Sequence, residues 1–507
     1  MAEATDDPVA RILAYHEATK HSPESVRRRF HPLDWDNKPN PFKVYLGLER
    51  VPIPEDVPSV RVPALEAIGV AEVRDPAPGP DLAGLARILV RGASVHHTSA
   101  FGGDVYHFRN YASAGALYPI EIYLACADLA DLPAGLYHFD PARPALTRLR
   151  QGDHRGYLVR AGASEPIVAR APVVLVLTGI PWRTAWKYTE RGYRHLFWDA
   201  GMVLANVLAL AASARLPTRV VLGFTDAEVS RLLGLEERRE FPLCLVPVGV
   251  SDDEVLPADA PPGKDSFEFG PLSRTEYVHQ GILEANDAGR LDSAEEVSAW
   301  RLASFAQEPG AGEPRPAPVA DSLEEVIRRR GSARVFGPGS IPADVLADIL
   351  QRATAGIATD YAPSGASLTG AYVIANAVDG LEPGAHVFRD GDFRLLKSGD
   401  LRREAGFLCL EQDLGATAAA THFLMADLPG TLGALGARGY RAAQLEAGIV
   451  AGRIYLSAYA HRFGTTGLTF YDQEVTRYLS PDAEGTSCML VVAVGDSPRL
   501  HRPPAGR

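Results

Sequence analysis

Residues 191–234 read RGYRHLFWDAGMVLANVLALAASARLPTRVVLGFTDAEVSRLLG and residues 438–480 read RGYRAAQLEAGIVAGRIYLSAYAHRFGTTGLTFYDQEVTRYLS, so one block of sequence occurs twice. Two further blocks recur in the same order. SAGALYPIEIYLACADLADLPAGLYHFD (113–140) returns as SGASLTGAYVIANAVDGLEPGAHVFRD (364–390), and FPLCLVPVGV (241–250) returns as SCMLVVAVGD (487–496). A period of about 250 residues is far too long for a solenoid. The chain is therefore predicted to be a fused duplicate of one unit.

Each copy has the same predicted order of elements. A first helix is followed by a Gly-rich turn, a β-hairpin, a long amphipathic helix, a short helix and a last strand, and this mixture predicts an α+β unit. The hairpins are indicated by PAGLYHF (133–139) and PGAHVF (383–388). Thr225 or Asp226, and Asp472, are expected to cap the short helices, because a side-chain oxygen there can accept from free backbone N–H groups.

Composition changes mark the domain boundaries. Residues 1–60 form a polar N-terminal arm that leaves through the Pro-rich stretch PIPEDVPSVRVP (52–63). Unit one is expected at 61–265 and unit two at 319–507. The segment between them, 266–318, contains EPGAGEPRPAP and is predicted to be a linker. We expect the arm to pack on the core.

The charge and cysteine content exclude several classes of protein. A formal charge of -12 argues against a general binder of nucleic acid or anionic membrane, because those partners select a basic face. The N-terminus lacks the apolar core of a signal peptide, and the longest apolar stretch, GMVLANVLALAASA, is shorter than a membrane span needs. The four cysteines are far apart and are predicted to be buried thiols. We expect a cytoplasmic protein that acts on a small molecule or peptide.

A cluster of cations opens unit two. Arg330, Ser332 and Arg334 place two guanidinium groups and a hydroxyl within five residues at a predicted helix end, which suits a phosphate group. Alone, such a cluster is more typical of a solvated basic surface. The corresponding stretch of unit one, LEAIGVAEVRDPAPGPDLAGLARIL, keeps only Arg74.

The turn ASAGALYPIEIYL (112–124) shows the reverse asymmetry between the units. Its small residues Ser113, Ala114 and Gly115 would let a flat ring lie against the backbone. Unit two has PSGASLTGAYVIA there, without the Tyr118-Pro119 pair. As a bare Gly-rich turn, it would favour a tight loop.

Together these motifs resemble those of a known superfamily. The Arg-x-Ser-x-Arg cluster, followed by IPADVLADIL, is similar to the opening of the flavin-dependent nitroreductases, in which it binds the FMN phosphate. SAGALYP followed by AGLYHFD, and the arm segment AYHEATKHS…LDWDNKPNPFKVYLGL, resemble the SagB-type azoline dehydrogenases of that superfamily. The resemblance implies two tandem units, each with a mostly antiparallel sheet flanked by helices, forming an intramolecular pseudo-dimer.

The resemblance also implies where the cofactor binds. In that superfamily one subunit holds the flavin phosphate and the other supplies the Ser/Gly turn. The Arg330/Ser332/Arg334 cluster of unit two and the Ser113-Ala114-Gly115 turn of unit one would therefore share one FMN, and the complementary pair would form a degenerate second site. Further flavin contacts are implied for Gly467 and Leu468, and more weakly for Arg499. No metal site is expected.

Lys187-Tyr188 precedes the long helix of unit one in WKYTERGYR, whereas unit two has GALGARGYR. The pair could be only a polar helix opening, but the resemblance implies a catalytic role in azoline oxidation. That reaction removes a C–H proton and a hydride equivalent, so it needs a base opposite the flavin. Either Lys187 or Tyr188 could serve, and the sequence does not decide between them.

Other polar residues have structural interpretations. His96-His97 are adjacent and lack further ligands at metal spacing, so a polar loop near the flavin is favoured. Asp199 and Glu446 occupy equivalent positions and favour a structural contact, as does the repeated Arg191-Gly192-Tyr193-Arg194 motif.

The sequence favours an FMN-dependent azoline dehydrogenase. The expected reaction converts thiazoline or oxazoline rings to thiazole or oxazole in a ribosomally made peptide, with dioxygen as acceptor and a cyclodehydratase as complex partner. A carrier-bound nonribosomal peptide is a variant. Two alternatives are an NAD(P)H-dependent nitro- or quinone reductase and a non-catalytic flavoprotein scaffold.

Overall fold

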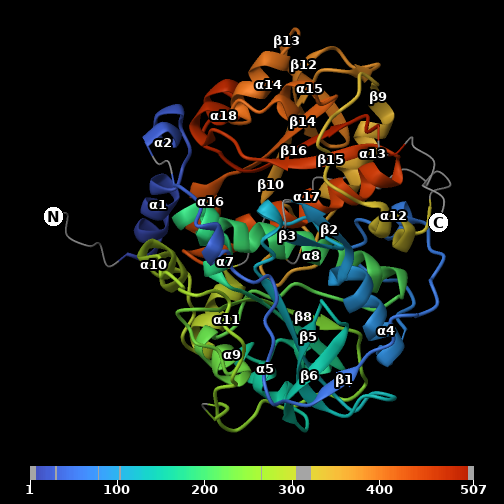
Figure 1. Cartoon of the computed structure of the whole chain (residues 1–507), viewed down its shortest axis with the longest axis vertical. Coiled ribbons are helices and arrows are strands. Elements are labelled where there is room, and N and C mark those ends of the chain that lie inside the picture. Colours follow the sequence, from blue (N-terminus) through green and yellow to red (C-terminus); the bar gives the residue numbers. More distant parts are fainter. Residues whose placement is uncertain are drawn as a thin grey trace.

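Two six-stranded antiparallel sheets form the two halves of the molecule. The computed structural model describes residues 7–28, 31–77, 79–101, 104–263, 265–303, 321–362, 364–498 and 500. Sheet one has the order β1-β6-β5-β4-β7-β8 and lies in the lower half of Figure 1, and sheet two has the order β13-β12-β10-β14-β16-β15 and lies in the upper half. Apart from β1, which comes from the N-terminal arm, each sheet is built from one repeat, so the α+β duplicate is confirmed. Its strands are β1 (Arg50–Pro52), β4 (Ile120–Cys126), β5 (Gly135–Asp140), β6 (Ala145–Gln151), β7 (Val173–Gly179), β8 (Phe241–Val248), β10 (Thr369–Ala375), β12 (Gly384–Arg389), β13 (Asp392–Ser398), β14 (Ala420–Ala426), β15 (Gly464–Leu468) and β16 (Ser487–Gly495).

Helices flank both sheets, and two short strand pairs complete the fold. The pairs are the hairpin of β2 (Val95–Phe101) with β3 (Asp104–Arg109), and β9 (Ile341–Pro342) with β11 (Val378–Asp379). The helices are α1 (Pro8–Ala18), α2 (Pro23–Arg28), α3 (Ala64–Ala67), α4 (Leu82–Ala86), α5 (Arg155–Ala161), α6 (Pro166–Arg170), α7 (Pro181–Tyr188), α8 (Gly192–Ser213), α9 (Asp226–Leu233), α10 (Gln280–Ala288), α11 (Ala294–Leu302), α12 (Leu323–Arg329), α13 (Ala343–Thr354), α14 (Arg402–Leu408), α15 (Asp413–Thr417), α16 (Leu428–Leu435), α17 (Gly439–Ala460) and α18 (Asp472–Leu479).

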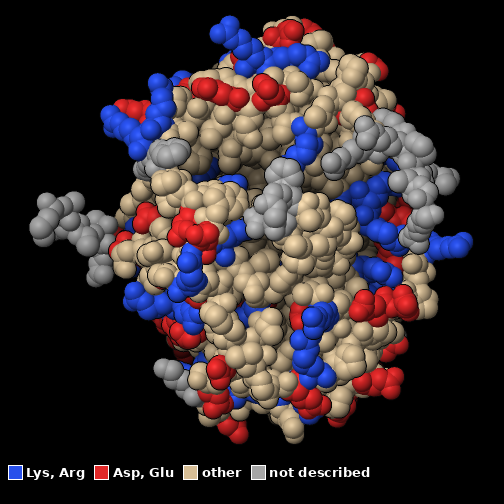
Figure 2. Space-filling view, viewed as in Figure 1, with Lys and Arg blue, Asp and Glu red and all other residues tan. Residues whose placement is uncertain are grey.

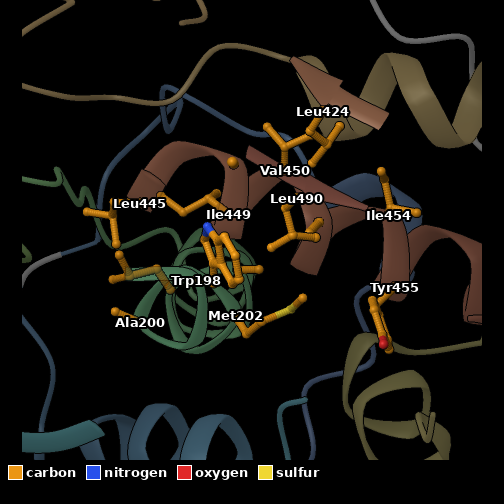
Figure 3. Close-up of a cluster of buried hydrophobic side chains, with 14 of the residues drawn as sticks. Trp198, Ala200, Met202, Leu424, Leu445, Ile449, Val450, Ile454, Tyr455 and Leu490 are labelled. Carbon is orange, nitrogen blue, oxygen red and sulfur yellow. The ribbon is translucent and has the colours of Figure 1, made fainter. Parts of the chain in front are cut away.

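The long helices α8 and α17 pack against each other between the two sheets (Figures 1 and 3). Every residue of α17 is buried, and so is every residue of α8 before its last two. The prediction that these helices are amphipathic is therefore wrong. Each one is covered by its own sheet on one side and by the other long helix on the opposite side, so no face is left for water.

Gly201 of α8 and Gly448 of α17 meet where the two helices cross. A Cβ atom on Gly201 would lie 2.4 Å from the carbonyl carbon of Gly448, and one on Gly448 would lie 2.6 Å from the carbonyl oxygen of Trp198. The obstacles are backbone atoms, which cannot move aside as a flexible side chain could. The close approach of the two helices in this structure thus requires glycine at both positions.

Replacing Gly201 by alanine should separate the two long helices. We expect the free energy of unfolding, measured by denaturant titration, to fall by about 1–3 kcal/mol, as in other overpacked cores. Gly433 in α16 is a matched control, because a Cβ there would meet nothing within 4 Å. Gly433→Ala should leave stability unchanged or raise it by up to about 1 kcal/mol. Equal effects of the two substitutions would contradict this account of the crossing.

The Arg-Gly-Tyr-Arg motifs join the two units by buried ion pairs. Arg191 and Arg194 of unit one both contact Asp472 of unit two, at 3.0 and 2.8 Å. In the other direction, Arg438 and Arg441 of unit two both contact Asp226 of unit one, at 2.6 and 2.7 Å. The structural interpretation of this motif is confirmed.

The prediction that side chains cap the two short helices is wrong, because the two aspartates bind arginines instead. Thr225 precedes α9 and Tyr471 precedes α18, and neither side chain caps its helix. Asp226 and Asp472 are instead the first residues of these helices. Their carboxylates are engaged by two guanidinium groups each, a stronger interaction than a neutral N–H can offer.

The arm and the segment after unit one both pack on the core. The arm runs from α1 and α2, beside α18 of the upper half, to β1, which pairs with β6 at the edge of the lower sheet (Figure 1). Residues 266–303, part of the predicted linker, include α10 and α11, and Ile282, Val297 and Trp300 are buried. The Pro-rich stretch 308–318 lies outside the described residues.

Two further sequence expectations concern buried groups. All four cysteines are buried and free, as predicted. One helical segment of the described chain, Pro181–Ser213, is long and apolar enough to cross a membrane, and 89% of its apolar window is buried inside the protein.

Candidate active site

Lys187 and Tyr188 lie directly against the Ser113–Gly115 turn. Gly115 has a φ of +62°, and a Cβ on it would lie 3.2 Å from the Tyr188 hydroxyl and 3.3 Å from Lys187 Nζ. Both side chains end α7, which lies between the two halves of the molecule near the β2–β3 hairpin (Figure 1). On this face, charged side chains lie mostly toward the periphery (Figure 2). The structure therefore brings together two motifs that are about 70 residues apart in unit one.

Asp199 of α8 holds the turn in place. It accepts hydrogen bonds from the Ser113 hydroxyl and, at 3.2 Å, from the Ala114 N–H. Burial raises the pKa of Asp199 to about 7, although these hydrogen bonds oppose the shift. Glu446 plays the same part in unit two, where it accepts from Ser367 and from both the N–H and the hydroxyl of Thr369. The structural interpretation of both acids agrees with this geometry.

Arg330 of unit two reaches across to unit one. Its guanidinium is 6% exposed and donates through Nη2 to the carbonyl of Arg109 at 3.0 Å. Its Nε has no hydrogen-bond partner, and among the described residues no carboxylate pairs with it. Burial lowers the pKa of this guanidinium. A buried cation without a counter-ion is costly, so the residue is suited to an anionic ligand.

Ser332 and Gly467 are linked through Tyr455 of α17. The Tyr455 hydroxyl is hydrogen-bonded to Ser332, and it accepts the N–H of Gly467 at 2.6 Å. Gly467 is exposed, whereas its neighbour Leu468 is buried. Arg499 lies outside the described residues.

Arg334 connects the two halves of the site. Its exposed side chain is close enough to Lys187 to act on it electrostatically: burial, Arg334 and then Lys38 lower the pKa of Lys187. Burial and the charge of Asp199 raise the pKa of Tyr188. Arg334 of the unit-two cation cluster and the Lys-Tyr pair of unit one thus lie within electrostatic range of each other.

The residue types of these two clusters fit FMN. The buried and unpaired guanidinium of Arg330, the cation of Arg334 and the hydroxyl of Ser332 form a donor set for a phosphate. Gly115, beside the Lys-Tyr pair, and Gly467, beside Tyr455, are exposed and present backbone rather than side chains.

The corresponding region on the other side of the pseudo-dimer is closed. In the repeat, Val220 of unit one stands at the position of Gly467, and it is completely buried. Val220 pairs with Thr359 of unit two, and its N–H donates to the carbonyl of Ala358 at 2.9 Å. Unit two therefore covers the backbone that is exposed at the first site.

Two further observations support this closure. Asp360 accepts from the N–H groups of Leu222 and Gly223 at 2.9 and 2.8 Å, which ties the units together at this point. Arg74, the one residue that unit one keeps from the cation cluster, is exposed. The chain itself thus covers residues 220–223 of unit one.

Sequence reasoning missed several residues of the site. Lys38 lies in the arm segment that carries the family resemblance, but the sequence assigns it no role, and the Arg109 carbonyl comes from a segment with no recognisable motif. His96 is expected from the sequence in a polar loop near the flavin; it lies instead in strand β2, where burial and Arg330 lower its pKa to about 4. Tyr455 could have been found, because its counterpart in unit one is Leu208. A polar residue present in only one copy of a buried helix is a usable signal.

Comparison with known proteins identifies the class. The model of the nitroreductase family matches residues 75–250 and 327–496. The chain belongs to the nitroreductase family and contains two nitroreductase-like segments, which implies a flavin oxidoreductase.

Individual relatives agree with this assignment. The chain is 34% identical to the nitroreductase-like protein MJ1384 of Methanocaldococcus jannaschii over 146 residues, which are 29% of this chain and 72% of that protein. It is 31% identical to the microcin B17-processing protein McbC of Escherichia coli over 154 residues, which are 29% of this chain and 57% of McbC. A nitroreductase structure from Anabaena variabilis superimposes with a TM-score of 0.75 at 22% identity. The superposition covers 96% of this chain and 99% of the Anabaena chain. This last likeness shows the fold alone.

Proposed function

We propose that the chain is an FMN-dependent azoline dehydrogenase with one active site, formed by both units. The observation that carries the proposal is the position of Lys187 and Tyr188, which touch the Ser113–Gly115 turn and lie within electrostatic reach of Arg334. A nitro- or quinone reductase has no need for a base at this place. The similarity to McbC, which processes microcin B17, supports a peptide substrate.

The roles of the residues follow from their surroundings. Arg330, Ser332 and Arg334 would hold the FMN phosphate, and the Ser113–Gly115 turn, Gly467 and Leu468 would line the rest of the cofactor site. FMN bound there would supply the hydride acceptor, with dioxygen as the proposed final electron acceptor.

Lys187 is the better candidate for the base. Burial and the nearby cations Arg334 and Lys38 disfavour its ammonium form, so the neutral amine needed to take the ring proton is easier to reach. Burial and Asp199 act in the opposite sense on Tyr188 and keep it protonated. Tyr188 would then donate a hydrogen bond that orients the substrate.

A complex with a cyclodehydratase is part of the proposal. Azoline rings arise when a cyclodehydratase condenses Cys, Ser or Thr side chains with the preceding amide, so that enzyme class would supply the substrate. We also propose that the chain acts in the cytoplasm, consistent with its buried, unpaired cysteines.

The flavin content of the purified protein tests the single site. We expect about one FMN per chain, because the second region is filled by Val220 and Thr359. Arg330→Ala/Arg334→Ala should lose the flavin, and the matched control Arg74→Ala should keep it. Flavin would be measured by absorbance after release by denaturation. Two FMN per chain would contradict the closed second region, and none would favour the scaffold alternative.

The activity assay distinguishes the proposal from the reductase alternative. The flavin-loaded protein should oxidise a thiazoline-containing peptide, so that the peptide loses about 2 Da per ring. The same protein should oxidise NADPH only slowly. Rapid NADPH oxidation without ring oxidation would favour the nitro- or quinone reductase.

A further inference from the structure

Thr189, the residue after Tyr188, has a backbone conformation that suits glycine. Its φ is +50° and its ψ is −135°. A β-branched residue with positive φ is a genuine outlier, and such conformations persist only where the surroundings enforce them. The counterpart of Thr189 in unit two is Gly436, with φ +57° and ψ −164°. The same turn is therefore unstrained in the unit that lacks the Lys-Tyr pair and strained in the unit that has it.

Contacts on both sides of Thr189 hold this conformation. Before it, the Trp186 carbonyl contacts His31 Nε2 at 3.1 Å, and Trp186 Nε1 donates to the Asp34 carbonyl at 2.9 Å. After it, the Glu190 carbonyl accepts the Tyr15 hydroxyl at 2.7 Å. The carboxylate of Glu190 accepts the N–H of Gly281 at 3.2 Å. The arm and α10 thus clamp the end of α7, although neither carries a residue of the Lys-Tyr pair.

The His195 ring of α8 stacks on one face of the Tyr188 ring. The two rings are stacked, with centroids 4.0 Å apart and planes 20° apart. His195 is 3% exposed, and neither ring nitrogen has a hydrogen-bond partner among the described residues. Burial and Arg191 lower its pKa, so the ring is neutral and places no further cation beside Lys187. Its counterpart in unit two is Ala442.

We propose that Thr189 and His195 are positioning residues that fix Tyr188 against the Ser113–Gly115 turn. The inference rests on the proposed function, which gives Tyr188 its substrate. The strained turn sets the direction in which the Tyr188 side chain leaves the end of α7, and the stacked imidazole sets the tilt of its ring. Both residues are replaced in unit two, by Gly436 and Ala442, together with the Lys-Tyr pair.

The test separates stability from activity in one pair of variants. Thr189→Gly relieves strain, so the thermal midpoint should rise by about 2 °C, while kcat for ring oxidation falls about tenfold at unchanged KM and FMN content. The matched control is Gly436→Thr, which adds the same strain in unit two, where a Cβ atom would meet nothing within 4 Å. It should lower the thermal midpoint and leave kcat unchanged. A merely structural role would make kcat follow stability in both variants.

Two substitutions of His195 test the role of the stacked ring. His195→Phe keeps a flat ring under Tyr188 and should retain kcat to within about threefold, whereas His195→Ala should lose about tenfold. If the parent protein is active and both Thr189→Gly and His195→Ala keep its full kcat, this inference is wrong, whereas the proposed function stands. No ring oxidation by the parent protein would overturn the proposed function, and the inference with it.

Discussion

Replacing Lys187 by alanine is expected to lower the rate of azoline oxidation by about 10²–10⁴-fold, the usual contribution of a general base. The FMN content should stay unchanged, because the residues proposed to hold the cofactor phosphate are Arg330, Ser332 and Arg334. Tyr188→Phe removes only a hydroxyl and should cost less in kcat. Single-turnover ring oxidation, followed by mass spectrometry, would measure both effects. Unchanged oxidation in the Lys187→Ala/Tyr188→Phe protein would instead favour a non-catalytic scaffold.

The pH dependence of the rate gives an independent test of Lys187. A base acts in its deprotonated form, so the rate should rise with pH through the pKa of Lys187, which burial, Arg334 and Lys38 hold below its ordinary value. Lys38→Met removes one of these cations and should raise that pKa. The rising limb of the rate profile should therefore move to higher pH. A limb that does not move would assign it to another group.

Replacing Asp472 by asparagine should destabilise the protein more than any other substitution considered above. Asp472 is buried and pairs with both Arg191 and Arg194, so the change leaves two buried guanidinium groups without a counter-ion. The expected loss in the free energy of unfolding is about 3–5 kcal/mol. Denaturant titration would measure it.

A control lies on the same helix. Glu474 pairs with Arg477 at the surface of α18, and Glu474→Gln should change stability by less than about 1 kcal/mol. If Asp472→Asn were equally mild, the joint between the units would not depend on the Arg-Gly-Tyr-Arg motif.

The same carboxylate makes the protein sensitive to acid. Although burial opposes the shift, Arg191 and Arg194 hold the pKa of Asp472 at about 2, below the value of about 3.9 in an unfolded chain. Its contribution to stability is therefore complete above about pH 4 and is lost as the pH falls toward 2. Asp472→Asn should remove this part of the acid dependence.

The sequence alone determined the duplication and the complementary loss of motifs. A repeat is visible because both copies keep the same apolar and glycine pattern, and residues such as Arg330 and Lys187 are visible because their charge has no counterpart in the other copy. These are properties of residue type and spacing, which need no coordinates. The α+β fold followed from them.

Only the tertiary structure decided which of these residues meet, and how. Val220 and Thr359 close the second region through backbone pairing, which side-chain identity does not encode. Asp472 resembles a helix cap in sequence but binds two arginines that lie about 280 residues earlier in the chain. The strain at Thr189 is also invisible in the sequence, because threonine normally avoids positive φ and adopts it here only under contacts from the arm and α10. Long-range packing, rather than local preference, sets these features.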